Sequence, residues 1–169
     1  TVYTSKLGTT GEYLTKMAQD NDALIAINGG GFEDPNYVGN GATPLGITFS
    51  NGKLITSKTY KGQGGLIGFT QDDKLVLGKM TAEKQKIRDG VTFGPFLIIN
   101  GKASSVSGNG GWGTAPRTAI GQRQDGIVLF LVVDGRTVTR PGATMKDLIE
   151  IFERYGAYNA SNLDKNSCK

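Results

Sequence analysis

Histidine is absent from the sequence, and cysteine occurs once, near the end of the chain. Without histidine, a Ser-His-Asp triad, a histidine-ligated zinc site and a histidine phosphoryl carrier are all excluded. The single thiol, Cys168, has no second cysteine in the chain with which to form a disulfide. Any chemistry must therefore use carboxylates, arginine, lysine, tyrosine, hydroxyls, amides or backbone groups.

Long apolar runs and dense basic clusters are also missing. No apolar stretch approaches the length of about 18 residues that spans a bilayer, and no secretory signal is visible. The formal net charge is +4, but the lysines and arginines form no stripe and do not alternate with aromatics. We expect no transmembrane segment in this chain and no nucleic-acid partner. A mild positive charge suits an anionic small substrate or an anionic cell surface.

Glycine is abundant, with 26 residues scattered between apolar runs, which is typical of a turn-rich β protein. Three hairpins are predicted at Asn51-Gly52, Asn100-Gly101 and Asp125-Gly126, because two-residue type I′ turns require positive φ angles. A looser hairpin is predicted at 71–73. The region 45–134 is therefore predicted to be mostly antiparallel sheet.

Two helices are predicted from apolar stripes with helical spacing. The first, over 11–21, has its stripe at Tyr13, Leu14, Met17 and Ala18. The second, over 144–156, has its stripe at Met145, Leu148, Ile149 and Phe152. Thr144 and Asp147 form a capping-box pair at its start, and Gly156 is placed as its C′ residue.

Two further strands complete the predicted elements. The short apolar run 23–27 suits a strand buried on both faces, and 157–163 suits a short returning strand. Sequential strands followed by a helix and a strand argue for an α+β fold. We predict a single domain with a mainly antiparallel mixed sheet and two main helices packed on one side of it.

Four predicted strand ends each present a polar side chain, from Asn28, Arg117, Asp134 and Asp164. Three of them also have a structural explanation: a tight turn at Asn28, a solvated surface at Arg117 and an Asp-Gly turn at Asp134. The amides of Gly29–Gly31 suit either a tight turn or an anion-binding nest. A functional Arg117 would bind phosphate or carboxylate through its bidentate fork.

Four segments in a fixed order carry a resemblance to a known family. They are AINGGGF at 26–32, GPFLIINGK at 94–102, PRTAIG at 116–121 with VVDGR at 132–136, and GAT at 142–144 followed by YGAYNASNLD at 155–164. Together they resemble the phosphodiester glycosidase family. The resemblance implies hydrolysis of a glycosyl-1-phosphodiester, with N-acetylglucosamine as the sugar in the best-known case. It also implies an extracellular or cell-surface glycan as the substrate, including bacterial exopolysaccharide.

The resemblance assigns roles to particular residues. Asp134, Asp164 and Arg117 are the expected catalytic residues. The expected substrate-binding residues are Asn28, Gly29, Gly30, Gly31, Thr118, Arg136 and Asn162. We expect no cofactor and no metal ligands, since no ligand-spacing motif is present, with Ca²⁺ or Mg²⁺ as the alternative because several Asp and Asn oxygens would lie near a phosphate.

The family pattern places a Gly- and Ser-rich loop after Asp164, where this chain has the residues 165–169. We interpret 1–169 as a phosphodiester glycosidase-like domain that is trimmed or incomplete at both ends. A non-catalytic module that binds an anionic glycan is therefore the alternative to a hydrolase. A structural domain in a cell-surface assembly is the third hypothesis.

Overall fold

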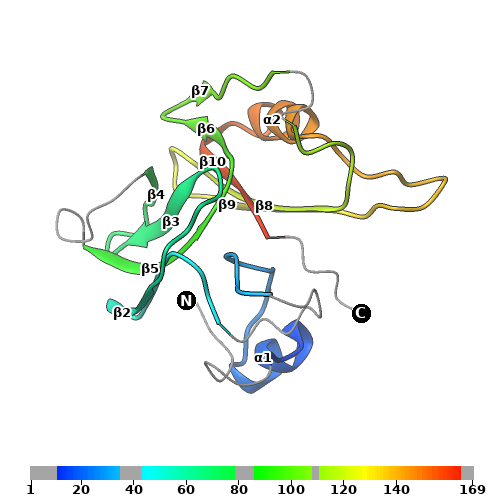
Figure 1. Cartoon of the computed structure of the whole chain (residues 1–169). Coiled ribbons are helices and arrows are strands. Elements are labelled where there is room, and N and C mark those ends of the chain that lie inside the picture. Colours follow the sequence, from blue (N-terminus) through cyan, green and yellow to red (C-terminus); the bar gives the residue numbers. More distant parts are fainter. Residues whose placement is uncertain (1–10, 35–42, 79–85, 108–110, 165–169) are drawn as a thin grey trace.

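The computed structural model describes residues 11–34, 43–78, 86–107 and 111–164. These residues form two helices and ten strands (Figure 1). The elements are α1 (Leu14–Asp20), β1 (Ile47–Ser50), β2 (Lys53–Ser57), β3 (Gly65–Thr70), β4 (Leu75–Gly78), β5 (Ile87–Phe93), β6 (Phe96–Ile99), β7 (Lys102–Ala103), β8 (Arg117–Arg123), β9 (Val128–Val133), α2 (Met145–Arg154) and β10 (Ala157–Leu163).

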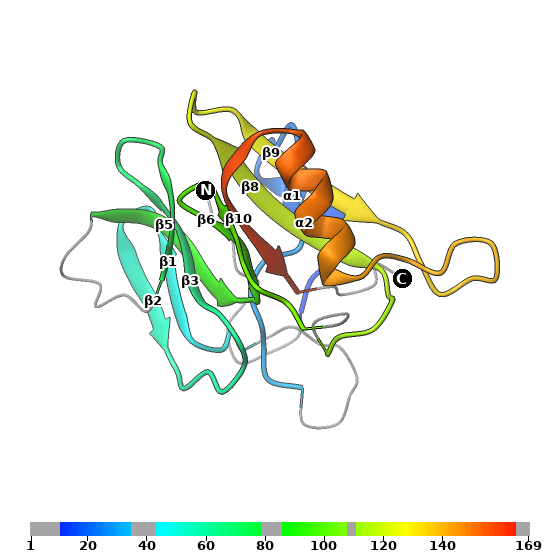
Figure 2. The same cartoon turned by 90° about the horizontal axis from the view of Figure 1, so that it is seen from above.

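The strands form two antiparallel sheets of five strands each, in the orders β2-β1-β5-β3-β4 and β7-β6-β10-β8-β9. The chain passes from the first sheet to the second between β5 and β6, through the cis peptide bond Gly94–Pro95. One core cluster lies between α2 and the second sheet, and another joins Ile67 and Leu75 of the first sheet to Ile120 and Leu163 of the second. Figure 2 shows α2 lying across the second sheet.

Side-chain amides reinforce the junction of the two sheets. The buried Gln122 accepts a hydrogen bond from the backbone N–H of Leu75 at 2.7 Å and donates to the carbonyl of Asp73 at 2.7 Å. Asn159 of β10 donates to the carbonyl of Leu75 at 2.9 Å. Because buried amides must find partners, these two residues fix the position of β4 against the second sheet.

The hairpin predictions are confirmed, with one difference in turn type. Asn51 and Gly52 both have positive φ, at 50° and 74°, and Asn100 and Gly101 have 51° and 75°, as type I′ turns require. At the third hairpin only Gly126 has a positive φ, 92°. Its N–H donates to the carbonyl of Arg123 at 3.1 Å, so this loop is longer than the predicted two-residue turn.

Helix α2 follows the sequence pattern closely. The Thr144 hydroxyl accepts from the Asp147 amide at 3.2 Å, and the Asp147 carboxylate accepts from the Thr144 amide at 2.7 Å. The Thr144 hydroxyl also donates to the Asp147 carboxylate at 2.8 Å, and the two bonds that this carboxylate accepts from Thr144 lower the pKa of Asp147. All four predicted stripe residues are buried, and Gly156 has a φ of 73°. The helix, its cap and its end are therefore confirmed, as is the returning strand β10.

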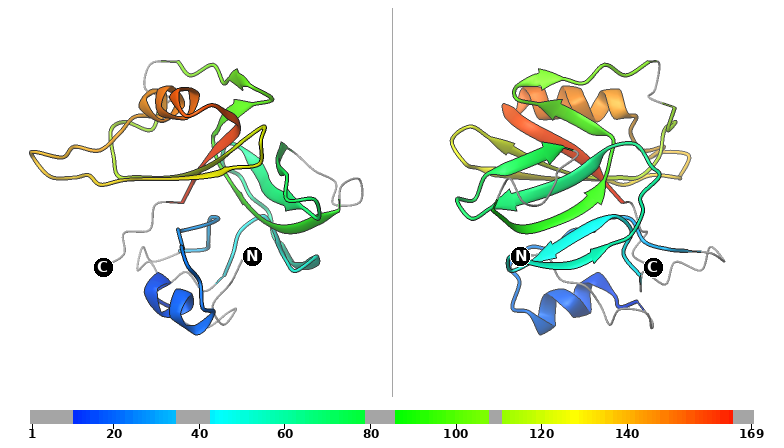
Figure 3. Two further views of the ribbon diagram at one scale, coloured as in Figure 1. Left: turned by 180° about the vertical axis from the view of Figure 1, so that it is seen from behind. Right: turned by 60° about the vertical axis from the view of Figure 1, so that its left-hand side comes forward.

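The segment before β1 differs from the prediction. Helix α1 is present, but none of its seven residues, all of them described, is buried. The run 23–27 is not a strand, and Leu24 and Ile25 are 100% and 68% exposed. A strand buried on both faces needs neighbours on each side, and the described part of the chain supplies none there. Figure 3 shows α1 and the chain after it lying apart from α2, beyond the sheets.

The α+β class is thus confirmed in that the described residues form both helices and antiparallel sheets. Two antiparallel sheets replace the one mixed sheet that was predicted, and α2 is the helix that contributes buried side chains to a core. Among the described residues, neither helix has the length and apolar character that crossing a membrane requires.

Candidate active site

Three of the four predicted strand ends meet at one end of the second sheet, where β8 begins and β9 and β10 finish. Strand β8 pairs with β10 at Thr118 opposite Leu163 and with β9 at Arg117 opposite Val133. Asp164 and Asp134 are the next residues after β10 and β9. The topology therefore places the two carboxylate-bearing residues on either side of Arg117 along the sheet edge.

The fourth strand end is brought to the same place by a backbone contact. The N–H of Asp164 donates to the carbonyl of Gly29 at 2.9 Å. Figure 1 shows the end of β10, in red, directed toward the blue chain that follows α1. Asn28 and the glycines after it therefore lie beside Asp164, although the run before them is not a strand.

Close packing explains why glycines occupy this position. A β-carbon at Gly30 would lie 2.9 Å from Cβ of Val91, and one at Gly31 would lie 3.3 Å from the ring of Phe93. The Gly31 amide donates to the carbonyl of Thr92 at 3.1 Å. None of the glycines 29–31 has a left-handed φ. The Gly31 amide therefore serves the contact with β5, which leaves at most two amides of the predicted nest for a ligand.

Asn162 is hydrogen-bonded through both its side-chain and its backbone nitrogen, whereas its side-chain oxygen has no partner among the described residues. Its side chain is 2% exposed, and its amide nitrogen Nδ2 donates to the carbonyl of Gly94 at 2.9 Å. Its backbone N–H donates to the carbonyl of Pro95 at 3.1 Å. The side-chain oxygen Oδ1 is buried and has no hydrogen-bond partner among the described residues. A buried carbonyl without a donor is costly, so this oxygen is suited to accept a hydrogen bond from a ligand.

Arg117 is 2% exposed and donates to backbone carbonyls. Its Nε donates to Ala143 at 3.0 Å, and its Nη2 donates to Trp112 at 2.9 Å and to Gly113 at 2.7 Å. Burial lowers the pKa of the guanidinium, which remains charged because the ordinary arginine value is so high. The observed bonds tie the 111–115 loop and the start of α2 to the sheet edge, and they place a buried positive charge beside the strand ends.

Asp134, Arg136 and Thr118 are less closely associated with this group. The Asp134 side chain is 79% exposed and lies 3.6 Å from Arg140. Arg136 is exposed, with a φ of 67°. Thr118 is buried, and the alternation of β8 places it on the same face as Ile120, toward the first sheet.

Three aromatic residues that contact one another, one of them near Asp164, were not predicted from the sequence. The rings of Tyr60 and Phe93 have centroids 6.2 Å apart, and those of Phe93 and Trp112 are 6.3 Å apart. Burial raises the pKa of Tyr60, and the charge of Asp164 raises it further. A signal was available, since Tyr60 and Trp112 both lie in glycine-rich turns and Trp112 is the single tryptophan.

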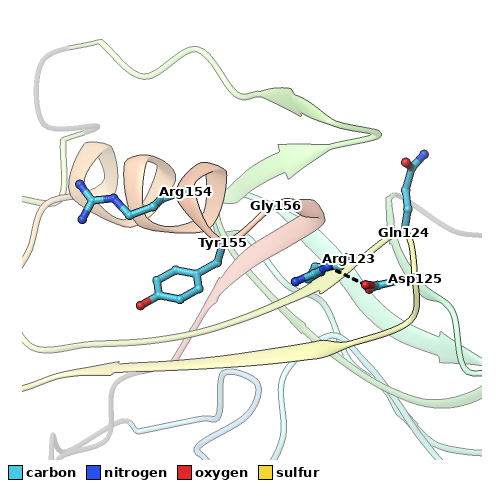
Figure 4. A pocket seen from close by; sticks show the side chains of 6 residues that line it. All are labelled: Arg123, Gln124, Asp125, Arg154, Tyr155 and Gly156. Atoms are coloured by element: carbon cyan, nitrogen blue, oxygen red, sulfur yellow. Dashed lines mark hydrogen bonds and ion pairs between the residues drawn. The ribbon is translucent and has the colours of Figure 1, made fainter.

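The described residues contain no group of three or more Asp, Glu or Cys side chains arranged to hold a metal ion. Two shallow hollows in the described surface lie elsewhere. One, near 450 Å³, is lined by residues of the β8–β9 turn and the end of α2, including Arg123 and Arg154 (Figure 4). In it Arg123 is paired with Asp125 at 2.6 Å.

The family model for phosphodiester glycosidases matches residues 21–164, which include every strand and α2. The chain belongs to the phosphodiester glycosidase family. The matched region contains all the strand-end residues described above.

Individual proteins are also similar to this chain. The SPbeta prophage-derived uncharacterized protein YomE of Bacillus subtilis is 28% identical over 95% of this chain and 26% of its own length. The catalytic domain of zebrafish N-acetylglucosamine-1-phosphodiester alpha-N-acetylglucosaminidase, auto-inhibited by its pro-peptide, has a TM-score of 0.73 and 21% identity over 90% of this chain. A hypothetical protein from Synechocystis has a TM-score of 0.61 and 16% identity over 95% of this chain.

The chain is shorter than these relatives. It covers 54% of the zebrafish chain and 49% of the Synechocystis chain. At these identities the structural matches show a shared fold for this part of the family domain.

Proposed function

We propose that this chain carries the hydrolytic site of a phosphodiester glycosidase and releases a sugar from a glycosyl-1-phosphodiester. The observation that carries the proposal is the setting of Asp164. It is a half-buried carboxylate at a strand end, its backbone N–H donates to the carbonyl of Gly29, and its charge adds to the burial that raises the pKa of Tyr60. Arg117, whose side chain is buried, comes directly before Thr118, and Thr118 pairs with Leu163, the residue before Asp164.

The reaction requires little beyond positioning and charge stabilisation. Water adds to the anomeric carbon, the bond from that carbon to the phosphate oxygen breaks, and a phosphomonoester leaves. Phosphate is already a good leaving group, so neutralising its charge matters more than protonating it. A carboxylate at the anomeric carbon acts as nucleophile or as the base for water, and a second carboxylate stabilises positive charge on the sugar.

The residues divide between these tasks. We assign Asp164 to the anomeric carbon and Asp134 to electrostatic stabilisation of the sugar. Arg117 and Arg136 supply positive charge toward the phosphate. The remaining proposed contacts to sugar hydroxyls and phosphate oxygens come from Asn28, Gly29, Gly30, Gly31, Thr118 and Asn162. The substrate we propose is an extracellular or cell-surface glycan, with N-acetylglucosamine as the first sugar to test.

Phosphorus NMR of a methyl diester of GlcNAc-α-1-phosphate tests this function. Wild type should convert the diester signal into that of methyl phosphate and release GlcNAc, and Asp164→Asn should not. Proton NMR of the first-formed sugar gives its configuration, which is α for a retaining enzyme and β for an inverting one. An intact diester after prolonged incubation with folded wild type would contradict the proposal.

A glycan-binding module is the second candidate, and two observations favour it. The Nε and Nη2 groups of Arg117 already donate to backbone carbonyls, and Asp134 is directed into solvent with Arg140 nearby. Calorimetric titration of wild type and Asp164→Asn with the same diester separates the candidates. A binding module retains its affinity in both proteins and forms no product in either.

A further inference from the structure

Tyr60, Phe93 and Trp112 form a row of contacting rings at the junction of the two sheets, and Tyr60 is the member that the charge of Asp164 affects. Tyr60 follows β2, Phe93 ends β5 and Trp112 precedes β8. Successive centroid separations are 6.2 and 6.3 Å, with interplanar angles of 48° and 62°. All three side chains are partly exposed. The row therefore presents tilted ring surface to solvent.

Gln63 holds the two ends of this row together. The Tyr60 hydroxyl donates to the backbone carbonyl of Gln63 at 3.1 Å, and Nε1 of Trp112 donates to its side-chain oxygen at 3.4 Å. Tyrosine and tryptophan usually bury their polar groups only with a partner. Here both polar groups have one, which leaves the faces of the rings as the surface available to a ligand.

Packing on the core makes the row rigid. Phe93 packs against the cluster between the sheets, and Trp112 packs against the cluster under α2. Arg117 holds the backbone of Trp112 by its bond to that residue's carbonyl. Rigid aromatic side chains bind ligands at a low cost in conformational entropy.

Polar groups suited to a sugar surround the row. The backbone at Gly29–Gly31 lies between the row and Asp164. At one end of this segment, a β-carbon at Gly31 would lie 3.3 Å from the ring of Phe93 and 3.7 Å from that of Tyr60. The carbonyl of Gly29, two residues earlier, bonds the Asp164 amide. Asn162, whose buried Oδ1 has no partner among the described residues, contacts Gly94 next to Phe93. A pyranose has an apolar C–H face that suits an aromatic ring and hydroxyl donors at its edge that suit acceptors such as Asp164 and Asn162.

We propose that the rings of Tyr60, Phe93 and Trp112 form a sugar-binding platform, fastened by Gln63, that seats a pyranose ring against Asp164. This inference rests on the proposed function, because it assigns the sugar half of the substrate to the platform. It also separates the two halves of the substrate: the platform recognises the sugar, and the charges of Arg117 and Arg136 act on the phosphate.

Trp112 allows the platform to be observed directly, because it is the single tryptophan in the chain. Its fluorescence emission is followed while wild type is titrated with GlcNAc, with GlcNAc-1-phosphate and with inorganic phosphate. Both sugars should change the emission saturably, and inorganic phosphate should not. Tyr60→Ala should weaken binding of GlcNAc about tenfold, whereas Tyr60→Phe retains the ring and should bind as wild type does.

Tyr155→Ala provides the matched control, since that tyrosine is 61% exposed at the end of α2. It should bind GlcNAc as wild type does. Trp112→Leu should raise KM for the methyl diester about tenfold while leaving kcat within about twofold, which a general loss of structure would not do. Thermal melts of every variant identify any loss of folding.

The outcomes separate the platform from the hydrolase proposal. If GlcNAc changes the fluorescence of Trp112 but the methyl diester is not hydrolysed, the platform is supported and the proposed hydrolase activity is contradicted. Hydrolysis with unchanged emission, together with an unchanged KM in Tyr60→Ala and Trp112→Leu, overturns the platform and leaves the hydrolase. A wild type that neither binds nor cleaves overturns both.

Discussion

Asp164 and Asp134 end two strands that flank β8, yet their surroundings differ greatly. Asp164 is half-buried, and its amide donates to the carbonyl of Gly29. Its charge helps to raise the pKa of Tyr60. Asp134 is 79% exposed, and among the described residues it forms an ion pair with Arg140. Water and salt screen an exposed charge strongly. Two carboxylates at similar positions in a sheet therefore differ in how strongly their charge acts on a bound substrate, because neighbouring segments enclose Asp164 and leave Asp134 in solvent.

The largest expected effect comes from neutralising each carboxylate in turn. We expect Asp164→Asn to lower kcat/KM for the methyl diester about 1000-fold, as for loss of an essential acid–base or nucleophilic group. Asp134→Asn should lower it about tenfold, because the charge of an exposed carboxylate is screened. Steady-state kinetics on both folded variants measure the ratio. Equal losses would remove the distinction between the two strand ends.

Arg117 lies between the two carboxylates, and its removal should affect stability as well as activity. Arg117→Met removes the side-chain donor to the carbonyls of Trp112 and Gly113 and one of the two donors to the carbonyl of Ala143, which also accepts from the Ala115 amide. We expect a loss of about 3 kcal/mol in the free energy of unfolding, measured by urea denaturation. Arg117→Lys should not restore it, because a lysine lacks the planar fork that reaches several carbonyls. A fully stable Arg117→Met protein would show that the three bonds contribute little.

A third carboxylate, Asp147, extends the comparison to a purely structural role. Asp147→Ala removes the capping box of α2 and should cost about 1 kcal/mol at neutral pH. The hydrogen bonds from Thr144 lower the pKa of Asp147, so its stabilisation is present above the ordinary aspartate pKa and is lost as the pH falls through the lowered value. The difference in Tm between wild type and variant should therefore shrink on acidification below about pH 4. A difference that stays constant down to pH 2 would contradict this.

The smallest expected effect concerns the partner of Asp134. Arg140→Ala removes a contact between two side chains that are 72% and 79% exposed, and such pairs contribute less than about 0.5 kcal/mol. Thermal melts at low and high salt should therefore give nearly the same Tm for wild type and variant. A drop of several degrees at low salt would mean that Asp134 is more strongly held than its exposure indicates.

Local sequence signals predicted the elements that depend on local interactions. The capping box, apolar stripe and terminal glycine of α2 appeared as predicted, as did the Asn-Gly hairpins. These features rest on residues within a few positions of one another. The order of the motifs also predicted that Arg117, Asp134 and Asp164 come from strand ends of one sheet.

Long-range partners decided what the sequence could not predict. The apolar run 23–27 suits a buried strand, but the described chain provides no neighbouring strand for it. The division into two sheets depends on how β5 and β6 separate around Gly94–Pro95. The meeting of Tyr60, Phe93 and Trp112 depends on three separate segments, and no spacing in the sequence encodes it.

A crystal structure of the Asp164→Asn variant with the methyl diester of GlcNAc-α-1-phosphate tests the central claim most directly. We predict that the sugar lies against the rings of Tyr60 and Trp112, with its anomeric carbon facing position 164. Sugar bound at another place, such as the hollow beside Arg123 and Arg154 (Figure 4), with the strand ends unoccupied, would contradict it.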